Sequence, residues 1–195
     1  MRNFWLYKAQ ILAARLRRRS PFFWLSRYTG DLTFFAMIGL PFATLGLLFH
    51  FAYTHHVQVQ LAQQRHTDLS CLAHNIYFEA RGESIDGQQA VAEVTLNRVS
   101  SKRFPDDVCG VVHEQRWDSI RKRYVGAFSW TELDSLRRPK GMPWEQATIV
   151  AVAAYDSGEA SAVPGALFYH ADRITPRWSI EKRLVAEIGN HKFYE

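Results

Sequence analysis

The longest apolar run in the chain is Leu32–Tyr53, LTFFAMIGLPFATLGLLFHFAY, which has 22 residues and no charged side chain. A helix needs about 20 apolar residues to cross a bilayer, so the pattern predicts a transmembrane helix. Pro41 lies inside the run, and membrane helices tolerate such prolines because nearby groups satisfy the freed carbonyl. The alternatives are a buried helix of a soluble domain and a cleaved signal peptide, whose apolar region is shorter.

After this run, the sequence predicts mainly helices up to residue 157 and short strands from residue 166 onward. Residues 54–67 are polar and Gln-rich and predict a connector, helical or flexible, before a folded domain over 68–195. Helices are predicted at 68–82, with Thr67 or Asp68 as N-cap, and at 86–99, 106–114 and 144–157. Residues 115–133 predict a hairpin or long loop, and short strands are predicted at 166–171, 183–188 and 192–194. Helices followed by strands predict an α+β domain.

Charge is distributed unevenly along the chain. The net charge is +5, yet residues 1–30 hold seven Lys or Arg and no acid, while 17 basic and 18 acidic residues follow residue 53. The basicity therefore belongs to the N-terminal tail, which removes the main support for a nucleic-acid partner. Lys and Arg beside a span stay in the cytoplasm, which predicts a single-pass inner-membrane protein with residues 54–195 in the periplasm. The tail, residues 1–31, is either amphipathic and membrane-bound or unstructured.

Two cysteines, Cys71 and Cys109, fall in the part placed outside the cytoplasm. An oxidising compartment permits one disulfide between them, which would stabilise the fold by about 3 to 4 kcal/mol. Two buried free thiols are the alternative.

The stretch NIYFEARGE, residues 75–83, carries the chemistry of greatest interest. On a helix, Asn75, Glu79 and Glu83 share one face at a spacing of four residues. A like charge one turn away and partial burial both favour a protonated carboxyl group at Glu79, as general-acid cleavage of a glycosidic bond requires. Most glutamates in such a pattern are nevertheless solvated surface charges.

Five ordered blocks of sequence resemble the SleB family of cell wall hydrolases, the spore cortex-lytic enzyme type. The blocks cover about residues 68–194 and read CLAHNIYFEARGESIDGQQAVAEVTLNRV, FPDDVCGVVHE, FSW, ALFYHAD and IGNHKFY. The resemblance implies a lysozyme-like, helix-rich catalytic domain that cleaves peptidoglycan as a lytic transglycosylase without a cofactor. It also implies that Glu79, the first Glu of EARGE, is the catalytic acid.

A groove for sugar rings should surround that acid, and aromatic and polar side chains are expected to line it. The residues expected to bind substrate are Asn75, Glu83, Ser129, Trp130, Tyr169 and His170. Each has an alternative: Glu83 is favoured as a structural acid that ties down the turn at Arg81-Gly82, and aromatics such as Phe128 and Trp178 are more often core. His170 and His191 lack partners at ligand spacing, so no metal is expected.

One position departs from the family pattern: Ala127 stands before FSW, where many relatives have Gln. The alternative functions are a non-catalytic peptidoglycan-binding or scaffold protein, a hydrolytic muramidase, and an amidase or peptidase acting on the peptide stems. The muramidase would need a second carboxylate, for which Glu83 is the nearest candidate.

Overall fold

The computed structural model describes residues 8, 10–15, 21–133, 138–157 and 161–195, with the backbone alone for 21–29. These residues divide into two compact units, Met1–Gln60 and Leu61–Glu195, and each is considered by itself. Residues 10–15 of the basic tail are helical and exposed. The expectation of an amphipathic tail falls largely on residues 1–7 and 16–20, which lie outside the described residues.

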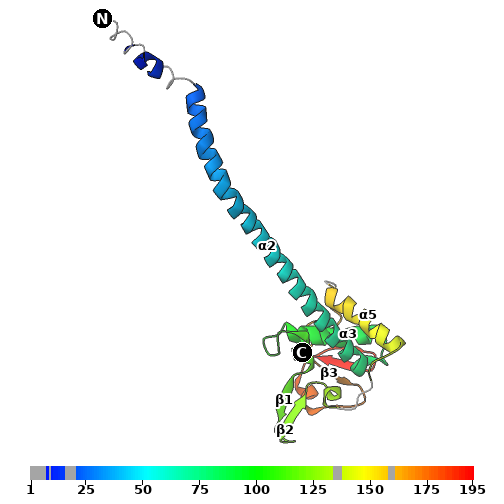
Figure 1. Cartoon of the computed structure of the whole chain (residues 1–195). Helices are drawn as coiled ribbons and strands as arrows, with labels where there is room; N and C mark the ends of the chain where they lie inside the picture. Colours follow the sequence, from blue (N-terminus) through cyan, green and yellow to red (C-terminus); the bar gives the residue numbers. More distant parts are fainter. Residues whose placement is uncertain (1–7, 9, 16–20, 134–137, 158–160) are drawn as a thin grey trace. The chain divides into compact units, whose positions relative to one another are not determined.

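The first unit contains most of one long helix, α2 (Pro21–Ala80), which is drawn as a continuous ribbon in Figure 1. Pro41 lies within it without ending it. The helix contains, between Gly30 and Ala80, one stretch long and apolar enough to cross a membrane, with a mean hydropathy of 2.0 and no burial. Membrane anchors and signal sequences both have stretches of this kind.

The expected start of a new helix at Thr67 or Asp68 is wrong, because α2 continues through both residues. No Gly or Pro occurs between Tyr53 and Arg81, so nothing in the sequence ends the helix there. Asp68 is buried within the helix and accepts hydrogen bonds from Gln64 Nε2 and Tyr155 Oη, both at 3.1 Å. Its carboxylate therefore joins α2 to a neighbouring helix instead of capping one.

The other α-helices of the second unit begin at local sequence signals, which are side-chain caps for two of them and a proline for the third. Ser84 precedes α3 (Ile85–Val99) and accepts a hydrogen bond from the backbone N–H of Gly87. Asp107 likewise caps α4 (Val108–Val112) through Gly110, at 2.7 Å. Pro143 lies in the first turn of α5 (Met142–Asp156), where its missing N–H costs nothing. The predicted helices in these three regions are confirmed.

Two small antiparallel sheets complete the unit. β1 (Gln115–Asp118) and β2 (Arg123–Gly126) form a hairpin, and β3 (Phe168–Ala171), β4 (Leu184–Ile188) and β5 (His191–Tyr194) form a sheet in the order β3-β5-β4. Gly189 has a φ of 57° in the tight turn between β4 and β5. Short 3-10 helices cover Ser129–Glu132 (η1) and Arg177–Glu181 (η2). The domain is therefore helix-rich α+β, as predicted.

Helix α3 is the central element, since it contacts α4, α5, β3 and β4. One core cluster joins the end of α2 to α4 and α5 through side chains such as Leu72, Ile76 and Val112. A second cluster joins α3 to the sheet through Val91, Val94 and Phe193. Cys71 and Cys109 form a disulfide between α2 and α4. Together these contacts fix the last turns of α2, where the candidate acid lies.

Candidate active site

Glu79 lies in the last turn of α2, one residue before the helix ends at Ala80. Its side chain enters a hollow of about 220 Å³ that is also lined by Arg98, Phe128, Ser129 and Tyr169. Tyr169, on β3, donates a hydrogen bond from its hydroxyl to Glu79 Oε2 at 3.2 Å. A helix end, the central helix, a strand and the loop before η1 thus converge on one carboxyl group.

Burial raises the pKa of the Glu79 carboxyl above its ordinary value, although the hydrogen bond from Tyr169 and the charge of Arg98 oppose this rise. The same burial, together with the nearby Glu79 charge, raises the pKa of Tyr169 well above its usual range. Tyr169 therefore stays a neutral donor. Glu79 has the properties of a carboxylic acid that holds its proton closer to neutral pH than a surface glutamate does.

A larger groove of about 850 Å³ adjoins this hollow and shares Glu79 with it. Four of the residues expected to bind substrate line it, namely Ser129, Trp130, Tyr169 and His170. Trp178 also lines the groove, whereas Phe128 is almost fully buried. His170 is largely buried, and its Nε2 lies 3.0 Å from the hydroxyl of Tyr194, so it contributes mainly to the wall.

Asn75, also expected to bind substrate, lies behind the groove and not on its surface. Its side chain is fully buried, donates from Nδ2 to Thr95 Oγ1, and accepts at Oδ1 from Trp130 Nε1, both at 3.1 Å. Trp130 stacks on Phe78 with ring centroids 4.7 Å apart. Asn75 and Phe78 therefore hold the Trp130 ring in place, and any effect of Asn75 on substrate is indirect.

Glu83 also points away from the groove, toward the turn between β4 and β5. Its Oε2 accepts from the backbone N–H of Asn190 at 3.0 Å, and its Oε1 accepts from Asn190 Nδ2 at 3.1 Å. His191 Nδ1 lies 3.7 Å from Oε1. Although burial raises the pKa of Glu83, the bonds from Asn190 and the charge of His191 outweigh it and leave the pKa below its ordinary value. This arrangement matches the structural alternative for Glu83.

Arg98 is the site residue that the sequence analysis missed. It lies on α3, is 8% exposed, and donates from Nε to the carbonyl of Leu167 at 2.8 Å. A usable signal was present, because Val91, Val94 and Arg98 follow one inward face at helical spacing. A charged residue on an apolar face is the kind of exception that marks a site.

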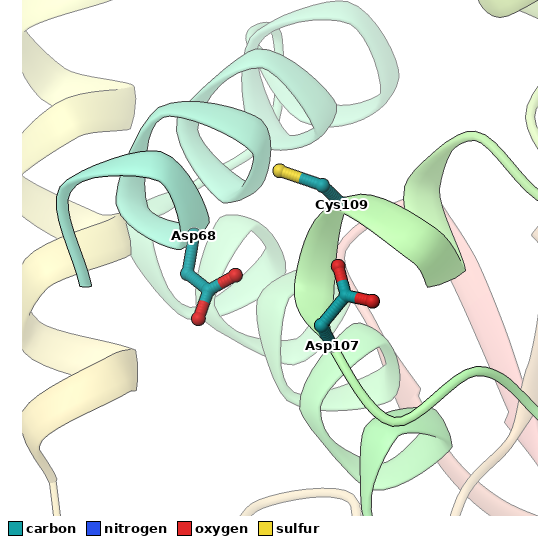
Figure 2. Close-up of side chains that lie close together, drawn as sticks. All are labelled: Asp68, Asp107 and Cys109. Atoms are coloured by element: carbon teal, nitrogen blue, oxygen red, sulfur yellow. The ribbon is translucent and has the colours of Figure 1, made fainter. Parts of the chain in front are cut away.

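Among the residues that the structure describes, one group of side chains has the composition of a metal site, namely Asp68, Asp107 and Cys109 (Figure 2). Figure 2 shows the two carboxylates and the sulfur facing one another between α2 and α4. The Cys109 sulfur is bonded to Cys71, however, and a disulfide sulfur is not the thiolate that metals require. Asp107 caps α4 and Asp68 accepts from two donors, so these groups already have structural roles.

The family model described as Cell Wall Hydrolase matches residues 82–194 of the chain. The chain belongs to this family. The match begins three residues after Glu79, so the role of that residue is argued from its geometry and from the EARGE motif.

Relatives of the chain include the spore cortex-lytic enzymes of Oceanobacillus iheyensis, 33% identical over 65% of this chain, and of Bacillus subtilis, 31% identical over 66%. The matched regions cover 41% and 37% of those proteins, so the chain spans about two fifths of their length. A solved structure, the catalytic domain of the germination-specific lytic transglycosylase SleB from Bacillus anthracis, is 30% identical. It matches 66% of this chain and 93% of its own, with a TM-score of 0.50. The domain has the SleB-like fold.

Replacing Glu83 by Gln should lower the free energy of unfolding at neutral pH by about 1 to 2 kcal/mol, because charged acceptors form the stronger hydrogen bonds. Since folding lowers the pKa of Glu83, its charge stabilises the protein above the unfolded pKa, and this contribution is lost as the pH falls through the folded pKa. Chemical denaturation of the full chain in detergent, from pH 7 to pH 3, should therefore show the wild type and the variant converging. Glu187→Gln, at an exposed ion pair with Lys192, is the control. A constant difference across this pH range would contradict the assignment.

Proposed function

We propose that this protein is a peptidoglycan-cleaving enzyme that breaks the bond between N-acetylmuramic acid and N-acetylglucosamine, with Glu79 as general acid. The observation that carries the proposal is a partly buried carboxyl group of raised pKa at the junction of a hollow and a groove of about 850 Å³, a volume within the range of ligand sites. Membership of the Cell Wall Hydrolase family and the names of the relatives support the choice of substrate.

In the proposed mechanism, protonated Glu79 donates its proton to the bridging glycosidic oxygen while positive charge develops at C1 of the muramic acid. The product carboxylate is stabilised by the hydrogen bond from Tyr169 and by the charge of Arg98. It then accepts the proton of the muramyl C6 hydroxyl as that oxygen attacks C1 and closes a 1,6-anhydro ring. Proton and electron pairs balance without a water molecule, and Glu79 ends protonated as it began.

The lytic route is favoured over hydrolysis by the inventory of acids. Glycosidases that use water need a second carboxylate about 5 to 9.5 Å from the first. Among the described residues that line the hollow and the groove, Glu79 is the only carboxylate, and Glu114 in the adjoining cavity accepts a hydrogen bond from Arg116 instead. Glu83, the nearest sequence candidate for that second acid, is bonded to Asn190 instead. A single carboxyl group, Glu79, beside the neutral hydroxyl of Tyr169 can donate a proton to the glycosidic oxygen and later accept one from the C6 hydroxyl.

Binding of the glycan is assigned to the walls of the groove. Trp130 and Trp178 offer apolar ring faces for sugars, and Ser129 offers an exposed hydroxyl. Tyr169 serves both functions, since it lines the groove and contacts the acid.

Replacing Glu79 by Gln should reduce the rate of glycan cleavage by about 10² to 10⁴-fold, because the amide cannot donate a proton of suitable acidity. The measurement is digestion of purified sacculi by the full chain in detergent, with mass spectrometry of the released muropeptides. Anhydro ends are expected from the wild type, and ends heavier by one water would indicate a muramidase. Glu145→Gln, an exposed acid in the first turn of α5, is the control. Full cleavage by Glu79→Gln would contradict the proposed role of this acid, whereas a biological effect of Glu79→Gln that survives the loss of cleavage would favour a scaffold.

Replacing Tyr169 by Phe should move the alkaline limb of the pH–rate profile to higher pH. The lost hydrogen bond normally stabilises the Glu79 carboxylate and lowers its pKa, so without it the acid keeps its proton further into the alkaline range. The measurement is the pH at which kcat/KM falls on the alkaline side of the profile. This pH does not depend on any decrease in the maximal rate. Tyr155→Phe, which loses a bond to Asp68 instead, should leave the limb in place. A limb that moves to lower pH would overturn this account of the acid.

We further propose that the apolar part of α2 anchors the enzyme in the inner membrane, with the basic tail in the cytoplasm and residues 54–195 in the periplasm. The support is the exposed apolar stretch and the preceding residues 1–30, which hold seven Lys or Arg and no acid.

The full chain should therefore stay in the membrane pellet after an alkaline wash and keep its N-terminus by intact mass. Leu45→Arg should weaken retention, since a charge at the centre of a span costs about 2.5 to 3.5 kcal/mol. Leu61→Arg, beyond the apolar run, is the matched control. A soluble product that lacks its N-terminus would show a cleaved signal sequence instead.

A further inference from the structure

A second cavity, of about 310 Å³, adjoins the Glu79 hollow. The two share Arg98, Ala127 and Tyr169, so they are separated by single side chains. One of the shared residues is Ala127, whose side chain is a single methyl group, so little material separates the second cavity from the Glu79 hollow there. A group attached to a sugar held at Glu79 is therefore close to the second cavity.

The charges around this cavity are predominantly positive. Arg98 and Arg116 line it, and one acid, Glu114, accepts from Arg116 Nε at 2.9 Å. Two further cations flank its aromatic walls, because Arg103 lies 5.7 Å and Lys182 Nζ lies 3.8 Å from the ring centroid of Phe168. Four cations and one carboxylate give the cavity and its rim a formal charge of +3. Such a site favours an anion.

Arg98 makes the strongest case for an anionic ligand. Its guanidinium is almost buried, and among the described residues its only hydrogen bond is from Nε to the Leu167 carbonyl. Both Nη groups thus keep their donors for another partner, and the paired Nη–H fork matches the two oxygens of a carboxylate. It lies against the rings of Phe104 and Phe128, with centroids 5.3 and 5.2 Å away, and its charge also acts on Glu79 and Glu114.

The remaining walls suit the rest of a small peptide. Phe104, Phe168 and Trp178 provide apolar surface for short aliphatic side chains. Glu114 Oε2 is buried and has no hydrogen-bond partner in the part of the chain that the structure describes. An unpaired buried acceptor is costly, so an amide N–H from a ligand would be favourable beside it. Cations, apolar rings and one acceptor together complement an acidic peptide.

We propose that this cavity binds the carboxylate carried on the C3 substituent of the muramic acid whose glycosidic bond lies at Glu79. The inference rests on the proposed function, which places C1 of muramic acid at Glu79, and C3 belongs to the same ring. In a strand with intact stems the carboxylates belong to the peptide, and in a stripped strand the free carboxylate is that of the lactyl group. The cavity therefore determines which peptidoglycan the enzyme prefers.

The test measures equilibrium binding of soluble glycan strands to the full chain in detergent, in a Glu79→Gln background so that no strand is cut. Three probes are compared: strands with intact stems, strands stripped of stems by an amidase, and stem-bearing strands whose carboxylates have been converted to amides. Arg116→Gln should weaken binding of a carboxylate-bearing strand about tenfold, the loss of one charge-assisted contact. It should leave binding of the amidated strands unchanged. Lys182→Gln should also weaken binding of carboxylate-bearing strands, by a smaller factor, and leave binding of the amidated strands unchanged.

Arg121→Gln is the matched control, because it removes the same charge from the same hairpin at a residue that pairs with Asp118 outside the cavity. A loss confined to stem-bearing strands identifies the stem carboxylate, and a loss confined to stripped strands identifies the lactyl carboxylate. Equal losses from Arg116→Gln and Arg121→Gln, or an equal loss on amidated strands, would overturn the proposal.

Cleavage by the otherwise wild-type chain is scored separately. If the chain cleaves glycan and Arg116→Gln has no effect, the proposed role of the cavity is refuted and the proposed function stands. If binding is carboxylate-selective but no glycan is cleaved, the proposed function is refuted and the proposed role of the cavity stands.

Discussion

The site depends on the desolvation of one carboxyl group. Glu79 is attached to the end of a helix whose last turns are held by core packing and by a disulfide, so the side chain cannot avoid its hollow without breaking those contacts. Burial favours the neutral acid, while Tyr169 and Arg98 favour the carboxylate. This balance matters for the proposed mechanism, in which the group gives up a proton and later takes one back, so that neither form can be too stable.

Around Glu79, some residues line the site and others hold those residues in position. Asn75 and Phe78 lie on the same helix as the acid and fix Trp130 on the groove wall, so one helix sets the geometry of both. Glu83, one turn further along the chain, holds the turn before β5 through Asn190. Asn75, Glu79 and Glu83, spaced by four along one segment, therefore have three separate roles. Asn75 supports an aromatic wall, Glu79 is the proposed proton donor, and Glu83 fixes the sheet.

Local sequence signals predicted most of the fold. Pro143 in a first turn and Gly189 in a tight turn act within a few residues and were recognisable without the tertiary structure, and the caps Ser84 and Asp107, although equally local, were not named from the sequence. Thr67 and Asp68 looked like a cap but were not one, because the use of Asp68 depends on Tyr155, 87 residues away. The burial of Asn75 and the orientation of Glu83 also depend on distant partners. The place of Arg98 on the inward face of α3 was visible in the helical spacing, but its position between two neighbouring cavities depends on tertiary structure.

The disulfide between α2 and α4 connects the acid-bearing helix to the redox state of its surroundings. Cys71 is two turns from Glu79 on that helix, and such bonds persist only where thiols are kept oxidised. A chain still facing cytosolic reductants would lack a crosslink that contributes about 3 to 4 kcal/mol. Under the proposed function and location, the helix that carries Glu79 would gain this crosslink only on export, on the side of the membrane where the wall substrate is found.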